Sequence, residues 1–133
     1  MPVILLFALT FLSISSISFA STYEDKSFLC STRSHSVKGG FVFTNSVEVV
    51  KYNILVSSNG KKIIKKTLHC YNKIDDRVLI SLDSLINGCG KYHSYINSES
   101  LIYNVPFKDK ILYAQCKPYD SNLESKLEES LNK

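Results

Sequence analysis

Four cysteines are the residues whose type and spacing most directly indicate chemistry in this chain: Cys30, Cys70, Cys89 and Cys116. Their number is even, and none of their spacings is the Cys-x-x-Cys of a zinc site or a redox motif. They predict two disulfide bonds, for which four cysteines allow three pairings. We favour Cys30–Cys116 and Cys70–Cys89, because the first joins the start of the domain to its end and the second closes a local loop.

Stable disulfides require an oxidising compartment, and residues 1–20 predict export into one. The apolar run from Val3 carries no charge and ends in Ser18-Phe19-Ala20, with small residues at the positions that signal peptidase inspects. This is typical of a secretory signal peptide cleaved after Ala20, with an uncleaved membrane anchor as the alternative. Nothing after Ala20 approaches the ~18 consecutive apolar residues of a membrane span, so we expect a secreted protein without membrane contact.

Histidine and arginine are the other side chains that could serve in catalysis. We expect surface or packing roles for His35, in a serine-rich loop, and for His69, beside a disulfide cysteine. The chain contains no GxSxG or HExxH motif and no glycine-rich phosphate loop. The sequence therefore predicts no catalytic residue, no metal site and no cofactor.

Composition indicates one globular domain, because 44% of the residues are hydrophobic and only three are proline. The net charge of +4 permits contact with nucleic acid or acidic surfaces without requiring it. The clearest basic cluster is Lys61, Lys62, Lys65 and Lys66 around two isoleucines. It fits either a solvated strand with a protected edge or a surface that faces phosphate.

After the signal peptide we expect a short exposed leader at 21–27, a domain at 28–120 and a C-terminal helix at 121–133. Ser121 and Glu124 form a capping box for that helix, and its leucines are spaced i, i+4 and i+8. Alternating patterns between turn signals predict the strands. These strands are 37–43, 61–71, 77–82, 92–96, 100–105 and 111–116.

Residues 44–58 give conflicting signals. Asn45 and Glu48 resemble a helix start, and Phe43, Val47, Val50 and Ile54 would share one helical face. However, β-branched residues are frequent there, and Ser58-Asn59-Gly60 could equally be a hairpin turn. The pattern alone leaves helix and strand nearly even.

A resemblance bears on this choice. Phe28-Leu29-Cys30 near the mature N-terminus, Cys116 near the domain end and Phe43-Thr44-Asn45-Ser46 together resemble the RNase-like (RALPH) effectors of cereal powdery mildew fungi, over residues 28–116. In addition, Tyr103-Asn104-Val105-Pro106-Phe107 is similar to a strand of fungal extracellular guanyl-specific ribonucleases. The resemblance implies an α+β fold, with one central helix at 44–58 packed on a twisted antiparallel sheet.

The resemblance does not extend to the catalytic set. A glutamate of the ribonuclease strand is replaced here by Asn104, whose amide cannot accept the proton. We therefore expect a monomeric, catalytically inactive virulence effector that binds a host plant protein, possesses an RNase-like scaffold and is detected by immune receptors. Delivery into the host cell belongs to this expectation. The alternatives are an active secreted ribonuclease or ribotoxin, and an unrelated disulfide-stabilised secreted binding protein.

Contacts to RNA or to a protein partner would come from basic and aromatic residues. Tyrosines could stack on bases, or they could be half-buried strand residues. The loops at 31–38, 61–66 and 108–110 are further candidate recognition surfaces. The candidate contact residues are Lys61, Lys62, Lys65, Lys66, Tyr92, His93, Tyr95 and Tyr103.

Overall fold

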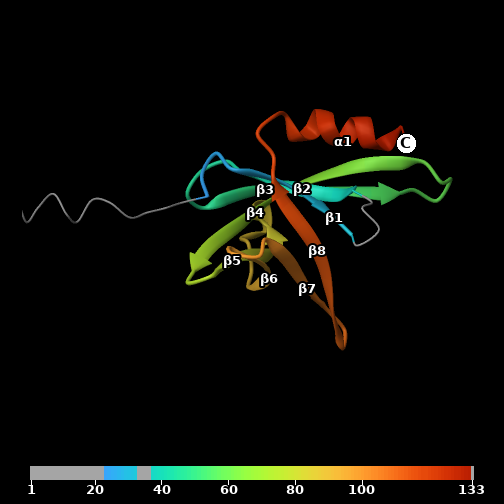
Figure 1. Ribbon diagram of the computed structural model, residues 1–133. Helices are drawn as coiled ribbons and strands as arrows, with labels where there is room; N and C mark the ends of the chain where they lie inside the picture. The colour runs from blue at the N-terminus through green and yellow to red at the C-terminus, as the bar shows by residue number, and fades with distance from the viewer. Residues whose placement is uncertain (1–22, 33–36, 133) are drawn as a thin grey trace, which may run out of the picture.

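Each strand of the chain pairs antiparallel with the next one, and the last strand returns to pair with the first, which closes a barrel of eight strands (Figure 1). The computed structural model describes residues 23–32 and 37–132, so the predicted signal peptide at 1–20 lies outside the described residues. In chain order the elements are β1 (Ser27–Ser31), β2 (Val37–Phe43), β3 (Glu48–Val56), β4 (Lys62–Ile74), β5 (Arg77–Ser84), β6 (Tyr92–Asn97), β7 (Ile102–Phe107), β8 (Lys110–Pro118) and α1 (Leu123–Leu131).

The barrel closes where the short strand β1 lies between β2 and β8. Cys30 of β1 stands directly opposite Cys116 of β8, and the two residues form a disulfide bond across this seam. A second disulfide joins Cys70 of β4 to Cys89 in the turn before β6. The predicted pairing of the cysteines is therefore confirmed.

Aromatic rings fill the interior of the barrel. Phe43 is fully buried, and its ring meets the Tyr71 ring edge-on at 4.7 Å between centroids. The rings of Phe28 and Tyr23 also pack against the Phe43 ring, with 5.9 and 5.2 Å between ring centroids. Tyr23 is buried, so the prediction of an exposed leader at 21–27 is wrong at this residue, because its side chain completes the core.

Helix α1 covers the outer face of β1 to β4 (Figure 1). Leu123 and Leu127 of the helix pack with Leu29 and Tyr52 from the outside of the sheet. Asn122 is the N-cap, since its side chain accepts a hydrogen bond from the backbone N–H of Ser125 at 2.9 Å. The predicted C-terminal helix is confirmed, with its cap one residue later than Ser121.

The expected α+β fold with a central helix at 44–58 is wrong: residues 48–56 form β3, which pairs with β4 across the Ser57–Lys61 turn. Both faces of β3 are covered, because Val49 points into the barrel and Val50 lies under α1. A strand that is apolar on both faces loses its alternating pattern, which explains the apparent helical face. In the described part of the chain, the other helical segment is one 3-10 turn at Leu85–Asn87.

The remaining predicted strands agree with the structure in position. The largest difference is at β4, which continues to Ile74, three residues beyond its predicted end. Strand β8 also continues beyond its predicted end, through Pro118, which pairs with Phe28 at the end of the seam. Within residues 23–32 and 37–132, no helix has the length and apolarity needed to cross a membrane.

The two disulfides should contribute unequally to stability. The Cys30–Cys116 bridge spans 86 residues and the Cys70–Cys89 bridge spans 19. From loop-closure entropy, the longer bridge should contribute roughly 4.6 kcal/mol to the free energy of unfolding and the shorter one about 3.3 kcal/mol. We expect the Cys30→Ser/Cys116→Ser double variant to lose more free energy of unfolding in urea than the Cys70→Ser/Cys89→Ser double variant. Equal losses would contradict this expectation.

Candidate functional site

The predicted lysine patch is divided between the two faces of the β3–β4 hairpin. Strand alternation places Lys62 and Lys66 on one face, where the Lys66 Nζ lies 5.6 Å from the centre of the Tyr52 ring, and Lys65 on the other. Among the described strands, β4 pairs only with β3 before His69. The lysines therefore border an open strand edge, which supports the interpretation that they protect this edge.

The predicted contacts on β6 lie apart from these lysines. Strand β5 separates β6 from β4, and it pairs with β4 only from His69 onward. The guanidinium of Arg77 covers the Tyr95 ring at 4.4 Å, and His93 Nε2 donates to the carbonyl oxygen of Pro106 at 3.1 Å. Tyr92 is exposed. The candidate contact residues are thus not brought into one surface.

The residues compared with a ribonuclease site are also dispersed. Asn104 is buried, stands between Tyr95 and Tyr113 in the strand register, and donates from Nδ2 to the carbonyl oxygen of Ile102 at 3.0 Å. His69 points into the barrel, whereas alternation along β6 puts His93 on the outside. His35 lies outside the described residues.

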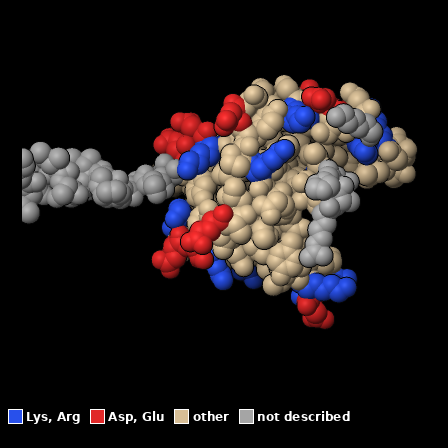
Figure 2. Space-filling model, in the orientation of Figure 1, with Lys and Arg blue, Asp and Glu red and all other residues tan. Residues whose placement is uncertain are grey.

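Charged side chains form no continuous basic band on the face shown in Figure 2, where lysines and arginines alternate with acidic residues around a broad uncharged area. In the described parts of the chain, no three His, Cys, Asp or Glu side chains are grouped so that they could hold a metal ion.

A cavity of about 330 Å³, which we call the mouth pocket, opens at the end of the barrel where β1 ends and β8 begins. The residues that line it include Phe41, Lys51, Asn53, Tyr103, Val105 and Leu112. They come from β2, β3, β7 and β8, so the pocket exists only because the barrel is closed. Its wall is mainly apolar, as is usual in sites for small molecules.

The floor of the mouth pocket is a pair of fixed aromatic rings. Phe41 and Tyr103 meet edge-on with 4.9 Å between ring centroids. The Tyr103 hydroxyl donates to Ser94 Oγ at 2.9 Å inside the barrel. Tyr103 is only 8% exposed and belongs to the core, where its remaining exposed surface lines the mouth pocket. It pairs with Ile96, so it lies on the opposite face of the barrel wall from Tyr95, the other tyrosine predicted to stack on RNA bases.

Lys51 provides a positive charge at this pocket. Its Nζ lies 5.5 Å from the centre of the Tyr103 ring, in a cation–π contact, and the side chain is half-buried. The neighbouring wall is backbone at Gly39, whose φ of +154° favours glycine. A Cβ atom there would overlap the carbonyl oxygen of Tyr52, so this part of the wall tolerates no side chain.

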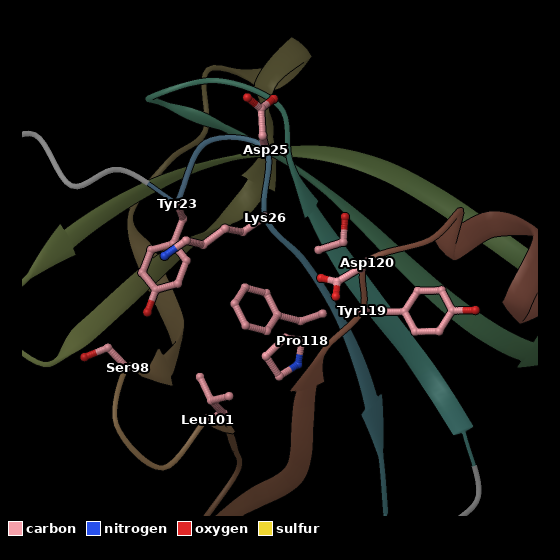
Figure 3. A pocket seen from close by; sticks show the side chains of 10 residues that line it. Tyr23, Asp25, Lys26, Ser98, Leu101, Pro118, Tyr119 and Asp120 are labelled. Carbon is pink, nitrogen blue, oxygen red and sulfur yellow. The ribbon is translucent and has the colours of Figure 1, made fainter.

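A second cavity, of about 470 Å³, lies at the opposite end of the barrel (Figure 3). Phe28, Leu101 and Pro118 form its apolar part. Its charged groups have both signs, because Lys26 lies over the Tyr23 ring at 4.8 Å and two aspartates stand at the rim. This second cavity would therefore select less strongly for the charge of a ligand than the mouth pocket.

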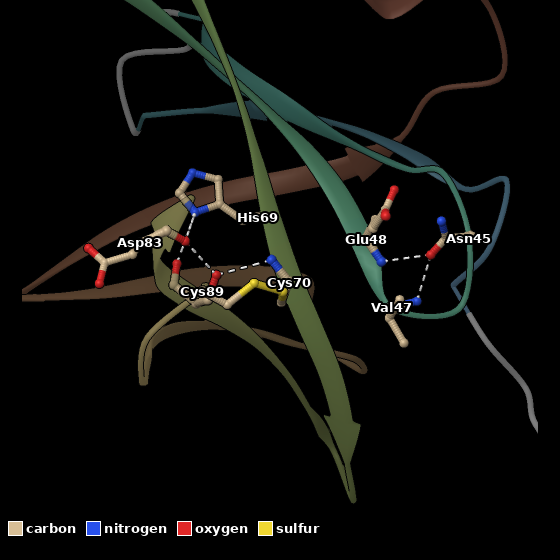
Figure 4. Close-up of a disulfide and its surroundings, with 8 residues drawn as sticks. Asn45, Val47, Glu48, His69, Cys70, Asp83 and Cys89 are labelled. Atoms are coloured by element: carbon tan, nitrogen blue, oxygen red, sulfur yellow. Dashed lines mark hydrogen bonds between the residues drawn. A yellow bond between two sulfur atoms is a disulfide. The ribbon is translucent and has the colours of Figure 1, made fainter. Parts of the chain in front are cut away.

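His69 is buried beside the Cys70–Cys89 disulfide (Figure 4). Its Nδ1 donates to the carbonyl oxygens of Ser81 and Asp83, each at 3.1 Å, and its Nε2 accepts from the Thr67 hydroxyl at 2.8 Å. Burial, reinforced by the charge of Lys51, lowers the His69 pKa, which the hydrogen bonds and the Asp83 carboxylate offset in part. The imidazole is thus a neutral structural group at pH 7.

Comparison with known proteins adds no family assignment: no family model, no curated protein and no solved structure matches this chain.

Sequence reasoning missed the mouth pocket. Phe41 and Tyr103 are separated by 62 positions in the chain and meet only through barrel closure. One local signal was present, because Lys51 interrupts the apolar run Val49-Val50-Lys51-Tyr52. A cation at an inward-facing strand position is costly to bury and therefore marks a site worth testing.

The His69 environment predicts a pH dependence of stability. Because the folded-state pKa lies below the ordinary value of 6.5, the unfolded chain binds the proton first as the pH falls. The free energy of unfolding should therefore be constant above about pH 6.5 and decrease below it, down through the folded-state pKa of His69.

The contribution of Lys51 can be measured separately. Lys51→Met removes a repulsive charge, so the His69 pKa should rise in this variant while burial still holds it below 6.5. NMR titration of the imidazole measures both values, and Lys91→Met, at an exposed lysine, is the control. A wild-type His69 pKa at or above 6.5 would contradict the predicted environment.

Proposed function

We propose that this chain is a secreted, non-catalytic binding protein whose binding site for a small, mainly apolar ligand is the mouth pocket. The observation that carries the proposal is a cavity of about 330 Å³ with a rigid aromatic floor at one end of a closed barrel. Eight-stranded barrels have an interior that either is filled by side chains or holds one small ligand. Here the side chains fill the middle and leave the end open.

Export is part of the proposal. Two disulfides fasten the barrel, and disulfides form and persist mainly in oxidising compartments. The RNase-like scaffold is no longer part of it, because the fold that the resemblance implied is wrong. Action as a virulence effector on a plant protein, delivery into the host cell and detection by an immune receptor stay predictions that rest on that resemblance.

Binding can be tested with the neutral fluorescent probe N-phenyl-1-naphthylamine on the oxidised protein. Ala114 lines the pocket opposite Tyr103, so Ala114→Phe should fill the space and weaken probe binding by about tenfold or more. Leu82→Phe, at an exposed position of β5, should bind like the wild type.

Thermal unfolding of each variant establishes that the barrel is intact. The absence of saturable binding by the wild-type protein would refute the proposed function, as would equal weakening by both substitutions.

The competing hypothesis is an active ribonuclease, which would cleave RNA. The positions of the histidines and of Asn104 do not favour this reaction. His69 and His93 lie on opposite faces of the barrel wall, and the amide of Asn104 cannot act as a base. We expect no RNA cleavage above background between about pH 5 and 8, since a general base alone contributes about 10²–10⁴-fold. Cleavage that disappears in His93→Ala would favour the enzyme instead.

A further inference from the structure

Lys51 occupies a position where an apolar residue would be expected. It follows the buried Val49 on the inward-facing side of β3, and its cross-strand partner on β4 is Thr67. A half-buried ammonium group costs free energy unless an opposite charge or an aromatic face compensates it. The Tyr103 ring supplies part of this compensation at 5.5 Å.

Among the described residues, no carboxylate forms an ion pair with Lys51. The residues that line the mouth pocket include two lysines, Lys38 and Lys51, and no aspartate or glutamate. The ion pair found in residues 23–32 and 37–132 is Lys126–Glu129 on α1, outside the barrel. The lining of the pocket therefore presents positive charge, with no carboxylate to pair with it, above an apolar floor.

The polar and apolar groups of the pocket are also separated in space. Lys51 and Asn53 follow one another on the inward-facing side of β3, and both can donate hydrogen bonds to one acceptor group. Phe41 and Tyr103 form the floor, and Val105 and Leu112 stand opposite each other on the far wall. One end of a bound ligand would thus contact hydrogen-bond donors, and the other end would contact apolar side chains.

We propose that the mouth pocket selects a small amphipathic anion, whose carboxylate binds Lys51 and Asn53 and whose apolar body lies on Phe41, Tyr103, Val105 and Leu112. This inference rests on the proposed function, to which it adds the chemical class of the ligand. A hydrogen bond to a charged group is worth enough to change affinity by about tenfold or more. The pocket should therefore discriminate by charge among ligands with the same apolar body.

The test uses three probes with a common decyl chain, each below its micelle-forming concentration: decanoate, decanol and decyltrimethylammonium. Each competes with N-phenyl-1-naphthylamine for the oxidised full-length protein. We expect decanoate to bind about tenfold or more tightly than decanol, and decyltrimethylammonium to bind weakest. Acetate, which has the headgroup without the chain, should not displace the fluorescent probe.

Three variants assign the selectivity to Lys51. Lys51→Met should bring the affinity for decanoate down to that for decanol, and Lys51→Arg should retain the preference because it keeps the charge. Lys91→Met, at an exposed lysine that does not line the pocket, should behave as the wild type.

The outcomes separate this inference from the proposed function. If neither the fluorescent probe nor any decyl compound binds, the proposed function fails and the inference fails with it. If decanol and decanoate bind equally well to the wild type, or if the preference survives in Lys51→Met, only the inference is overturned. The comparison within the wild type remains decisive even if Lys51→Met does not fold.

Discussion

A sheet that closes on itself encloses a volume that must be filled, and this constraint governs the rest of the structure. Six aromatic side chains fill most of the barrel: Tyr23, Phe28, Phe41, Phe43, Tyr71 and Tyr103. The rings meet edge-on or tilted, and the pair nearest one end of the barrel, Phe41 and Tyr103, leaves unfilled space above it. The mouth pocket is this unfilled space, so the packing of the core determines where the proposed site lies.

The sequence predicted local features well and the global arrangement poorly. Six strands and the C-terminal helix were recognised from alternation, turn residues and leucine spacing, and both disulfides were paired correctly. The failure at 44–58 has a definite cause, since β3 is buried by the barrel on one face and by α1 on the other. Asn45 illustrates the ambiguity: its side chain accepts from the N–H groups of Val47 and Glu48, as a helix cap would, but leads into a strand (Figure 4).

The candidate site was beyond sequence reasoning for a similar reason. Residues that are neighbours in the sequence of a strand do not form one surface, because consecutive side chains point to opposite faces of the sheet. The lysines at 61–66 are therefore divided between two faces, whereas Lys51 and Tyr103, far apart in the chain, come together inside the closed sheet. Lys51, a single lysine within an apolar strand, was thus a better indicator of the candidate site than the basic segment at 61–66.

The strand order also has a consequence for how the chain reaches this structure. Every pairing from β1–β2 to β7–β8 joins neighbours in sequence, but the β1–β8 pairing joins residues 86 positions apart at Cys30 and Cys116. Local hairpins form quickly, while contacts of long sequence separation carry the largest loop-closure entropy and form late. The open sheet that precedes closure exposes its aromatic inner face together with two unpaired edges. We therefore expect the seam to be the kinetic bottleneck of folding, and oxidation of its cysteines to be the step that makes closure effectively irreversible.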